Sequence, residues 1–352
     1  MTTKRAFTCF IPVGERRCAF TLVELLLVIG IIALLIAIVI PSLGAARKSA
    51  RAQVCMTNLR MFNTGFQSYA GDGKGLIASF SWQPGVMTPS EHANNRIVPP
   101  DAAVAHARQG VEIVRRLARD PGIIPSHVAD LRFIARNYTQ LVLMDGGYFG
   151  DRNPEPAVAC SEDRDALVWQ RLTPQQAVVE LAAHDHGSPP AFLPYYSSYQ
   201  IVPASFQDER GPGQIYHLIN DYRLYTLTPA STRFRQRRLD AVTFPSQKVV
   251  WFDLFDRHYG QGPRFFAYPT ARQPLAFFDG SVSVRQTRDA NLGWDNRPSA
   301  QFASPAAAMV TYAPMNPNDP PAQAGIGAVP QYYRWTRGGI RGVDFGGGEI
   351  RK

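Results

Sequence analysis

The first strong pattern in the chain is an apolar segment near the N-terminus. Every residue from Leu25 to Ile40 is apolar, and extending the segment back to Phe20 adds only Thr21 and Glu24 as polar positions. A helix of this length would measure about 30 Å at about 1.5 Å per residue, enough to cross the hydrocarbon core of a bilayer. The pattern therefore predicts a membrane-spanning helix. The alternative is an ordinary secretory signal that is cleaved among the small residues near Ala45.

Helical spacing continues beyond Pro41. Apolar side chains recur at roughly helical intervals as far as Tyr69, and the glycine-rich run from Gly71 to Gly75 then interrupts the pattern. We predict one helix that is kinked at Pro41 and ends near Tyr69, followed by a hinge into the rest of the chain.

The next part of the chain favours helices. Residues 128–142 carry apolar side chains at helical intervals, and residues 102–119 show a weaker pattern of the same kind. Thr173, Pro174 and Gln176 form an N-cap, a first-turn proline and a capping-box glutamine, so we expect a helix that runs to about Ala183.

After Pro190 the pattern changes to strands and turns. Residues 214–227 are rich in Tyr, Ile and Leu, residues 248–252 are typical of a buried strand, and Asp279-Gly280 lies between two apolar runs as in a β-hairpin. The predicted fold class is therefore α+β: a long N-terminal transmembrane helix, then a mixed head with helices first and an antiparallel sheet towards the C-terminus.

Composition and charge are compatible with a large folded head. The chain has 352 residues, 45% of them hydrophobic, and a formal net charge of +9. The basic residues are scattered, and several flank the apolar segment, where they would meet anionic lipid headgroups. We therefore expect inner-membrane lipid as a partner and no nucleic acid.

Glu24 lies inside the predicted span. A carboxylate there costs several kcal/mol unless it has a partner, so an ionisable residue at this depth indicates function. The segment from Arg16 to Glu24, Arg-Arg-Cys-Ala-Phe-Thr-Leu-Val-Glu, resembles the type III signal of prepilins.

That resemblance implies a set of processing and assembly residues. Prepilin peptidase would cut between Ala19 and Phe20 on the cytoplasmic side and N-methylate Phe20. Glu24 would become the fifth residue of the mature chain and would pair with the amine of a neighbouring subunit, while Pro41 would take the place of the family's helix-bending proline. Ala19 stands where the family usually has Gly.

A second resemblance concerns the head. A group of pilin-like proteins that is abundant in planctomycetes has a Cys-x-x-Asn-Leu-(Arg/Lys) segment and a His-x9-Asp-Gly hairpin. Residues 55–60 match the first element, and residues 277–282 match the core of the second. The histidine position holds Pro269.

Together these resemblances imply a structural, non-enzymatic subunit of a type II secretion pseudopilus or a type IV pilus-like filament. It would be a single-pass protein of the bacterial inner membrane, with a cytoplasmic leader and a periplasmic head, and it could be extracted from the membrane into a pseudopilus or pilus. Its partners would be the peptidase and other subunits, through the N-terminal helix. The alternative is a membrane-anchored binding module or enzyme exported with a pilin-type signal, in which tryptophans such as Trp251 line a site instead of packing in the core.

The predicted regions are a leader (1–19), the N-terminal helix (20–70), an extracytoplasmic head (75–315) and a flexible Pro/Gly-rich tail (316–352).

Other candidate sites are less specific. Cys55 and Cys160 would remain after leader removal, either as one disulfide or as two unpaired buried thiols. Asp289 and Asp295 are candidate calcium ligands because major pseudopilins with a similar N-terminal helix often bind calcium in this region. Residues 184–186, His-Asp-His, offer either two metal ligands or a solvated loop. Nothing specific indicates an enzyme, and we expect no cofactor other than the candidate calcium ion.

Overall fold

The computed structural model describes residues 21–123, 135–149, 155–181, 190–207, 216–217, 225–226, 234, 236–294, 307–314 and 318–346. The chain forms two compact units, Met1–Lys48 and Ser49–Lys352. The predicted leader and Phe20 lie outside the described residues.

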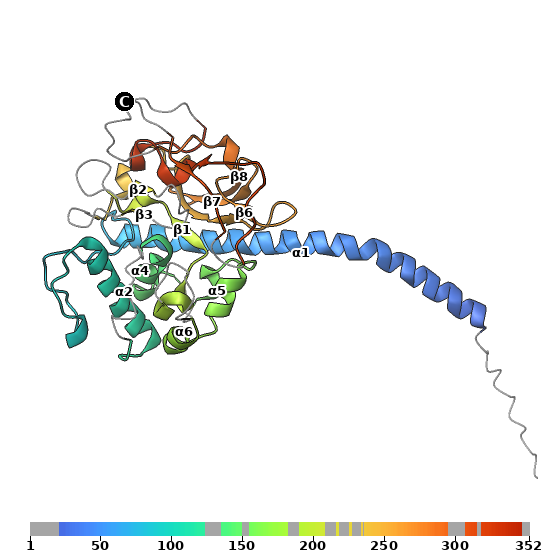
Figure 1. Cartoon of the computed structure of the whole chain (residues 1–352), viewed down its shortest axis with the longest axis horizontal. Coiled ribbons are helices and arrows are strands. Elements are labelled where there is room, and N and C mark those ends of the chain that lie inside the picture. Colours follow the sequence, from blue (N-terminus) through green and yellow to red (C-terminus); the bar gives the residue numbers. More distant parts are fainter. Residues whose placement is uncertain are drawn as a thin grey trace, which may run out of the picture. The chain divides into compact units, whose positions relative to one another are not determined.

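One long helix, α1 (Leu22–Asp72), passes through both units (Figure 1). In the first unit it is apolar, and its described side chains from Leu22 to Leu43 are all exposed. This part of α1 is long and apolar enough to cross a membrane. The helix continues past Pro41 and ends at Asp72, which confirms the predicted extent.

The central sheet of the second unit has four strands in the order β1-β4-β7-β8, and every neighbouring pair is antiparallel. Their bounds are β1 (Tyr199–Ile201), β4 (Val249–Asp253), β7 (Arg272–Phe277) and β8 (Val282–Gln286). All five residues of β4 are buried, which confirms the strand predicted at residues 248–252.

The β7–β8 connection is the predicted hairpin. Ala276 pairs with Val282, and Gly280 adopts φ 93°, a conformation that glycine accepts without steric cost. Asp279 Oδ1 accepts a hydrogen bond from the Ser281 amide at 2.9 Å. The Asp-Gly pair therefore provides both the turn geometry and a local polar contact.

The second half of α1 packs on this sheet. Asn63 Nδ2 donates to the Phe277 carbonyl at 2.8 Å, and Gln67 Nε2 donates to the Phe278 carbonyl at 2.7 Å. The Phe66 ring meets Trp251 and Phe278 edge-on, with centroids 6.2 and 5.9 Å apart. This half of α1 is thus the core helix of the head, and the turn after Asp72 connects two packed parts of one unit instead of acting as a hinge into the head.

On the other side of the second half of α1 lie the helices α2 (Ala102–Ala118), α4 (Gln140–Asp145), α5 (Arg164–Trp169) and α6 (Pro174–Leu181) (Figure 1). The helix α3 (Ala135–Tyr138) contacts β1. The capping box of α6 forms as predicted, with Thr173 N donating to Gln176 Oε1 at 2.8 Å and Gln176 N donating to Thr173 Oγ1 at 3.2 Å. The helix predicted at residues 128–142 is described only from Ala135, where it is broken into α3 and α4.

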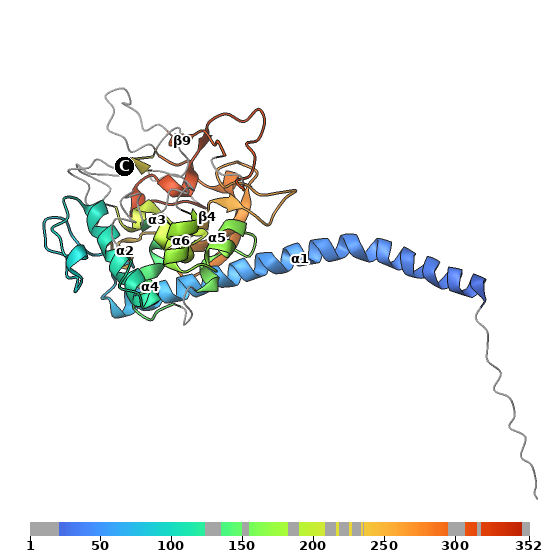
Figure 2. The ribbon, with the colours of Figure 1, turned by 60° about the horizontal axis from the view of Figure 1, so that its bottom comes forward.

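Three two-stranded ladders and several 3₁₀ turns complete the described structure. One strand of these ladders, β9, lies away from the helices α2 to α6 in Figure 2. The ladders pair β2 (Tyr216–His217) with β3 (Tyr225–Thr226), β5 (Phe255–Asp256) with β6 (Arg264–Phe265), and β9 (Met309–Val310) with β10 (Val329–Pro330). The 3₁₀ turns are Ala93–Asn95, Pro156–Val158, Pro190–Tyr195, Pro203–Ser205, Leu239–Ala241, Thr287–Asp289, Tyr332–Trp335 and Gly339–Arg341.

The C-terminal segment differs from the flexible tail predicted for residues 316–352. Within its described part, Tyr333 and Ile340 are fully buried. Asp344 reaches back to β4, where its carboxylate lies 3.1 Å from Lys248 Nζ and accepts from the Val249 amide at 2.8 Å. The segment is rich in Pro and Gly, which favour loops. It also contains aromatic and apolar side chains, and their burial holds the segment in the folded head.

Candidate functional site

The first candidate site is the N-terminal turn of α1. Glu24 Oε2 accepts hydrogen bonds from the backbone amide and the hydroxyl of Thr21 at 2.8 and 2.7 Å, and Thr21 Oγ1 accepts from the Glu24 amide at 3.2 Å. This reciprocal pair is a capping box, which satisfies backbone donors at the helix start. Glu24 therefore has a local structural role that the sequence analysis did not identify.

The apolar surface around Glu24 has no cover from the described residues. Leu22 and Val23 are each 73% exposed, and the large apolar side chains continue exposed to Leu43. An apolar surface of this extent indicates contact with lipid or with other helices. Ala19 and Phe20, the predicted processing residues, lie outside the described residues, and Pro41 lies within the helix.

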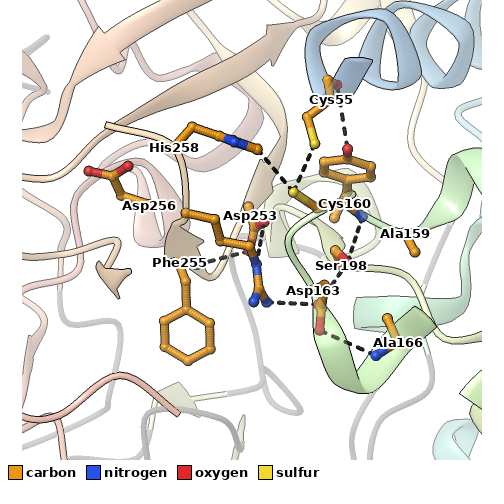
Figure 3. Close-up of polar contacts among 12 residues, drawn as sticks. Cys55, Ala159, Cys160, Asp163, Ala166, Ser198, Asp253, Phe255, Asp256 and His258 are labelled. Atoms are coloured by element: carbon orange, nitrogen blue, oxygen red, sulfur yellow. Dashed lines mark hydrogen bonds and ion pairs between the residues drawn. The ribbon is translucent and has the colours of Figure 1, made fainter. Parts of the chain in front are cut away.

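The second candidate site lies inside the head, where two cysteines and a histidine converge (Figure 3). Cys55 comes from α1, Cys160 from the loop after Pro156–Val158, and His258 from the β5–β6 turn. The two Sγ atoms lie 2.8 Å apart, and His258 Nε2 lies 3.1 Å from Cys160 Sγ. All three side chains are buried.

An ion-pair network holds the Cys160 loop in place. The Cys160 amide donates to Ser198 Oγ at 2.9 Å, and the Ser198 hydroxyl donates to Asp163 Oδ2 at 2.8 Å. Arg257 bridges Asp163 and Asp253 at 2.7 and 3.0 Å. The loop is thereby tied to β1 and to the segment that carries His258.

The electrostatic environment makes the two thiols unequal. The hydrogen bond with Cys160 lowers the pKa of Cys55 to about 4, with a smaller effect of the nearby His258. Burial raises the pKa of Cys160.

The three side chains could hold a soft metal ion by ligand type, since their ligand atoms all lie within 4.8 Å of one another. Their geometry fits poorly. Two thiolates at about 2.3 Å from one tetrahedral zinc ion would stand roughly 3.8 Å apart, whereas these sulfurs are 2.8 Å apart. A zinc-bound histidine also usually donates its other ring N–H to an acceptor, and His258 Nδ1 has no hydrogen-bond partner among the described residues.

The metal ligands predicted from the sequence gain no support from the described residues. Asp289 is exposed and lies 3.9 Å from Arg288, and no group of three acidic or His ligands forms around it within the described residues. Asp295 and residues 184–186 lie outside the described residues. Trp251 is fully buried in the core, which agrees with a packing role.

Sequence reasoning missed His258, Asp163 and Asp253 as neighbours of the cysteines. His258 is 98 residues from Cys160 along the chain, and no motif links them. The hairpin resemblance pointed instead to Pro269, the position at which the related proteins have a histidine. The Pro269 carbonyl accepts a hydrogen bond from the Arg288 amide at 3.3 Å.

The chain matches no protein-family model, no curated protein and no solved structure. Its function must therefore be inferred from its own residues.

Proposed function

We propose that the chain is a structural subunit of a pilin-like filament, either a type II secretion pseudopilus or a type IV pilus-like assembly. One observation carries the proposal: a single helix is exposed and apolar from Leu22 to Leu43, and the same helix is the core element of a folded head. Such a helix can anchor the subunit in the inner membrane and then pack with copies of itself in a filament.

Glu24 supports the same proposal. It is the one acidic residue in the exposed apolar part of α1, between Leu22 and Leu43. Once prepilin peptidase has released the Phe20 amine, Glu24 of one subunit pairs with that amine on a neighbour, so the burial of each charge is offset by the other. The leader then lies in the cytoplasm and the head in the periplasm.

The test separates charge pairing from helix capping. Glu24→Ala removes both functions, whereas Glu24→Gln keeps a capping-box side chain and removes the charge. We expect both variants to be lost from filaments in cells that contain the peptidase, with wild-type levels in the membrane. The measurement is the amount of each variant in sheared filaments and in cross-linked membrane oligomers.

Two outcomes would contradict the proposal in different ways. Incorporation of both variants at the wild-type level would show that assembly requires neither the charge of Glu24 nor its cap, which contradicts the role proposed for Glu24. Normal incorporation of Glu24→Gln beside failure of Glu24→Ala would show that Glu24 acts as a cap and not as a charge partner. N-terminal sequencing of the membrane-extracted protein provides an independent check, because the proposal requires N-methylated Phe20 as the first residue.

A further inference from the structure

Cys55 and Cys160 approach each other more closely than two thiols in ordinary contact. Their sulfurs are 2.8 Å apart although the residues are separated by 105 positions in the chain. A covalent S–S bond is about 2.05 Å long, so only a small displacement separates this contact from a bond. Each residue is 1% exposed.

The approach is set by the fold on both sides. Cys55 lies in the part of α1 that packs in the head, and the next turn of the helix is bound to the loop through Asn58 Nδ2 and the Ala159 carbonyl at 3.3 Å. On the other side, Ser198 Oγ holds the Cys160 amide at 2.9 Å. The two backbones therefore keep the sulfurs facing each other without help from a ligand.

His258 distinguishes a thiol pair from a metal site. Its Nδ1 atom is buried and has no hydrogen-bond partner among the described residues. Buried N–H groups without an acceptor are rarer in folded proteins than buried acceptors without a donor. The ring proton thus belongs on Nε2, where it points at Cys160 Sγ 3.1 Å away. A metal ligand would need Nε2 without its proton, so this tautomer favours sulfur chemistry.

We propose that Cys55 and Cys160 form a disulfide bond that links α1 to the loop between Pro156–Val158 and α5. The inference rests on the export of the head in the proposed function, since disulfide bonds form and persist outside the cytoplasm. It does not depend on filament assembly. The bond joins the helix that carries the membrane anchor directly to the part of the head built from residues far along the chain.

The bond forms by two thiol–disulfide exchanges with a disulfide-carrying oxidant, either a protein or a small molecule. The thiolate of one cysteine attacks one oxidant sulfur and releases the first oxidant thiol, which leaves a mixed disulfide on that cysteine. The other cysteine then attacks the cysteine sulfur of this mixed disulfide and releases the second oxidant thiol, and the two cysteine protons end on these released thiols. Because both cysteines are buried in the folded head, the oxidant must act before the head closes.

The decisive experiment uses full-length chain in detergent with Cys9→Ser and Cys18→Ser, so that Cys55 and Cys160 are the remaining cysteines. The protein is unfolded with reductant and refolded in a glutathione/glutathione disulfide buffer. Free thiols are then trapped with N-ethylmaleimide and the protein is digested without reduction. We expect one cross-linked peptide pair that contains Cys55 and Cys160, and no labelled thiol. Recovery of both cysteines as labelled thiols, or of one bound metal ion per chain with no cross-link, would overturn the inference.

Access to the bond provides a second readout. The folded protein should retain the cross-link in reductant and lose it once denaturant is added, because the sulfurs are buried. The oxidised protein should unfold at a higher denaturant concentration than the Cys55→Ser/Cys160→Ser double variant, and reductant during unfolding should remove that difference. Equal midpoints for the oxidised protein and the double variant would count against a cross-link that stabilises the head.

Protein extracted from cells separates this inference from the proposed function. A bond present both in glutathione buffer and in protein from membranes supports both. A bond that forms in glutathione buffer but is absent from the membrane protein supports the geometry and contradicts export of the head.

Discussion

At Gly65, α1 lies close to the loop after α4. A Cβ atom at Gly65 would lie 2.6 Å from the Tyr148 carbonyl oxygen, whereas a Cβ at Gly71 in the same helix would meet nothing within 4 Å. We predict that Gly65→Ala lowers the free energy of unfolding by about 1–3 kcal/mol, because the backbones must move apart. Gly71→Ala should leave it unchanged or raise it by up to about 1 kcal/mol. Urea unfolding of the full chain in detergent measures both, and equal stability of the two variants would contradict the close contact.

Asp253 makes the stability of the head sensitive to pH. Its burial raises its pKa to about 7, although Arg257 lies 3.0 Å away. Between the ordinary pKa near 4 and this value, the folded chain holds a proton that the unfolded chain has lost. The contribution of Asp253 to stability is therefore present at low pH and is lost as the pH rises towards 7.

The matching variant is Asp253→Asn, which cannot titrate. We predict that the difference in free energy of unfolding between the wild type and the variant falls between pH 4 and pH 7. The fall is at most about 1.4 kcal/mol per pH unit, and the difference is constant above pH 8. Denaturant unfolding at a series of pH values measures this difference. A difference that rises with pH would show that the Arg257 ion pair outweighs burial.

At the scale of elements, α1 has two halves with different environments. Phe66 is fully buried against the sheet, and Val54 on the same helix is 49% exposed. We predict that Phe66→Ala destabilises the head by about 3–5 kcal/mol through lost burial and a cavity. Val54→Ala, as the matched control, should change stability by no more than about 0.5 kcal/mol. Chemical unfolding followed by tryptophan fluorescence reports the change, since Trp251 packs on Phe66. A small effect of Phe66→Ala would mean that the stability of the head does not depend on the packing of α1 against the sheet.

At the scale of the whole molecule, the C-terminal segment closes the head through a buried ion pair. Burial raises the pKa of Asp344, while Lys248 at 3.1 Å and the Val249 amide at 2.8 Å favour the charged form. We predict that Asp344→Ala costs about 3–5 kcal/mol, because it leaves the Lys248 charge buried without its counter-ion.

The control for this prediction is the exposed pair of Arg238 and Asp240, whose charged atoms lie 2.7 Å apart. Asp240→Ala should leave the unfolding midpoint unchanged, since exposed ion pairs contribute little. If both variants unfold at the wild-type midpoint, the C-terminal segment does not close the head.

The sequence by itself determined the elements whose causes are local. The apolar run fixed the N-terminal part of α1, the Thr173–Gln176 capping box fixed the start of α6, and Asp279-Gly280 fixed the hairpin. In each case neighbours within a few positions set the backbone conformation, so the pattern is readable without the fold.

The tertiary structure alone decided which distant residues meet. Only packing brings Cys160 and His258 to Cys55, places Asp344 beside Lys248, and buries a Gly/Pro-rich segment that resembles a tail. These residues share no sequence motif. Their proximity comes from the burial of apolar side chains across the whole head, and that burial is a property of the complete fold.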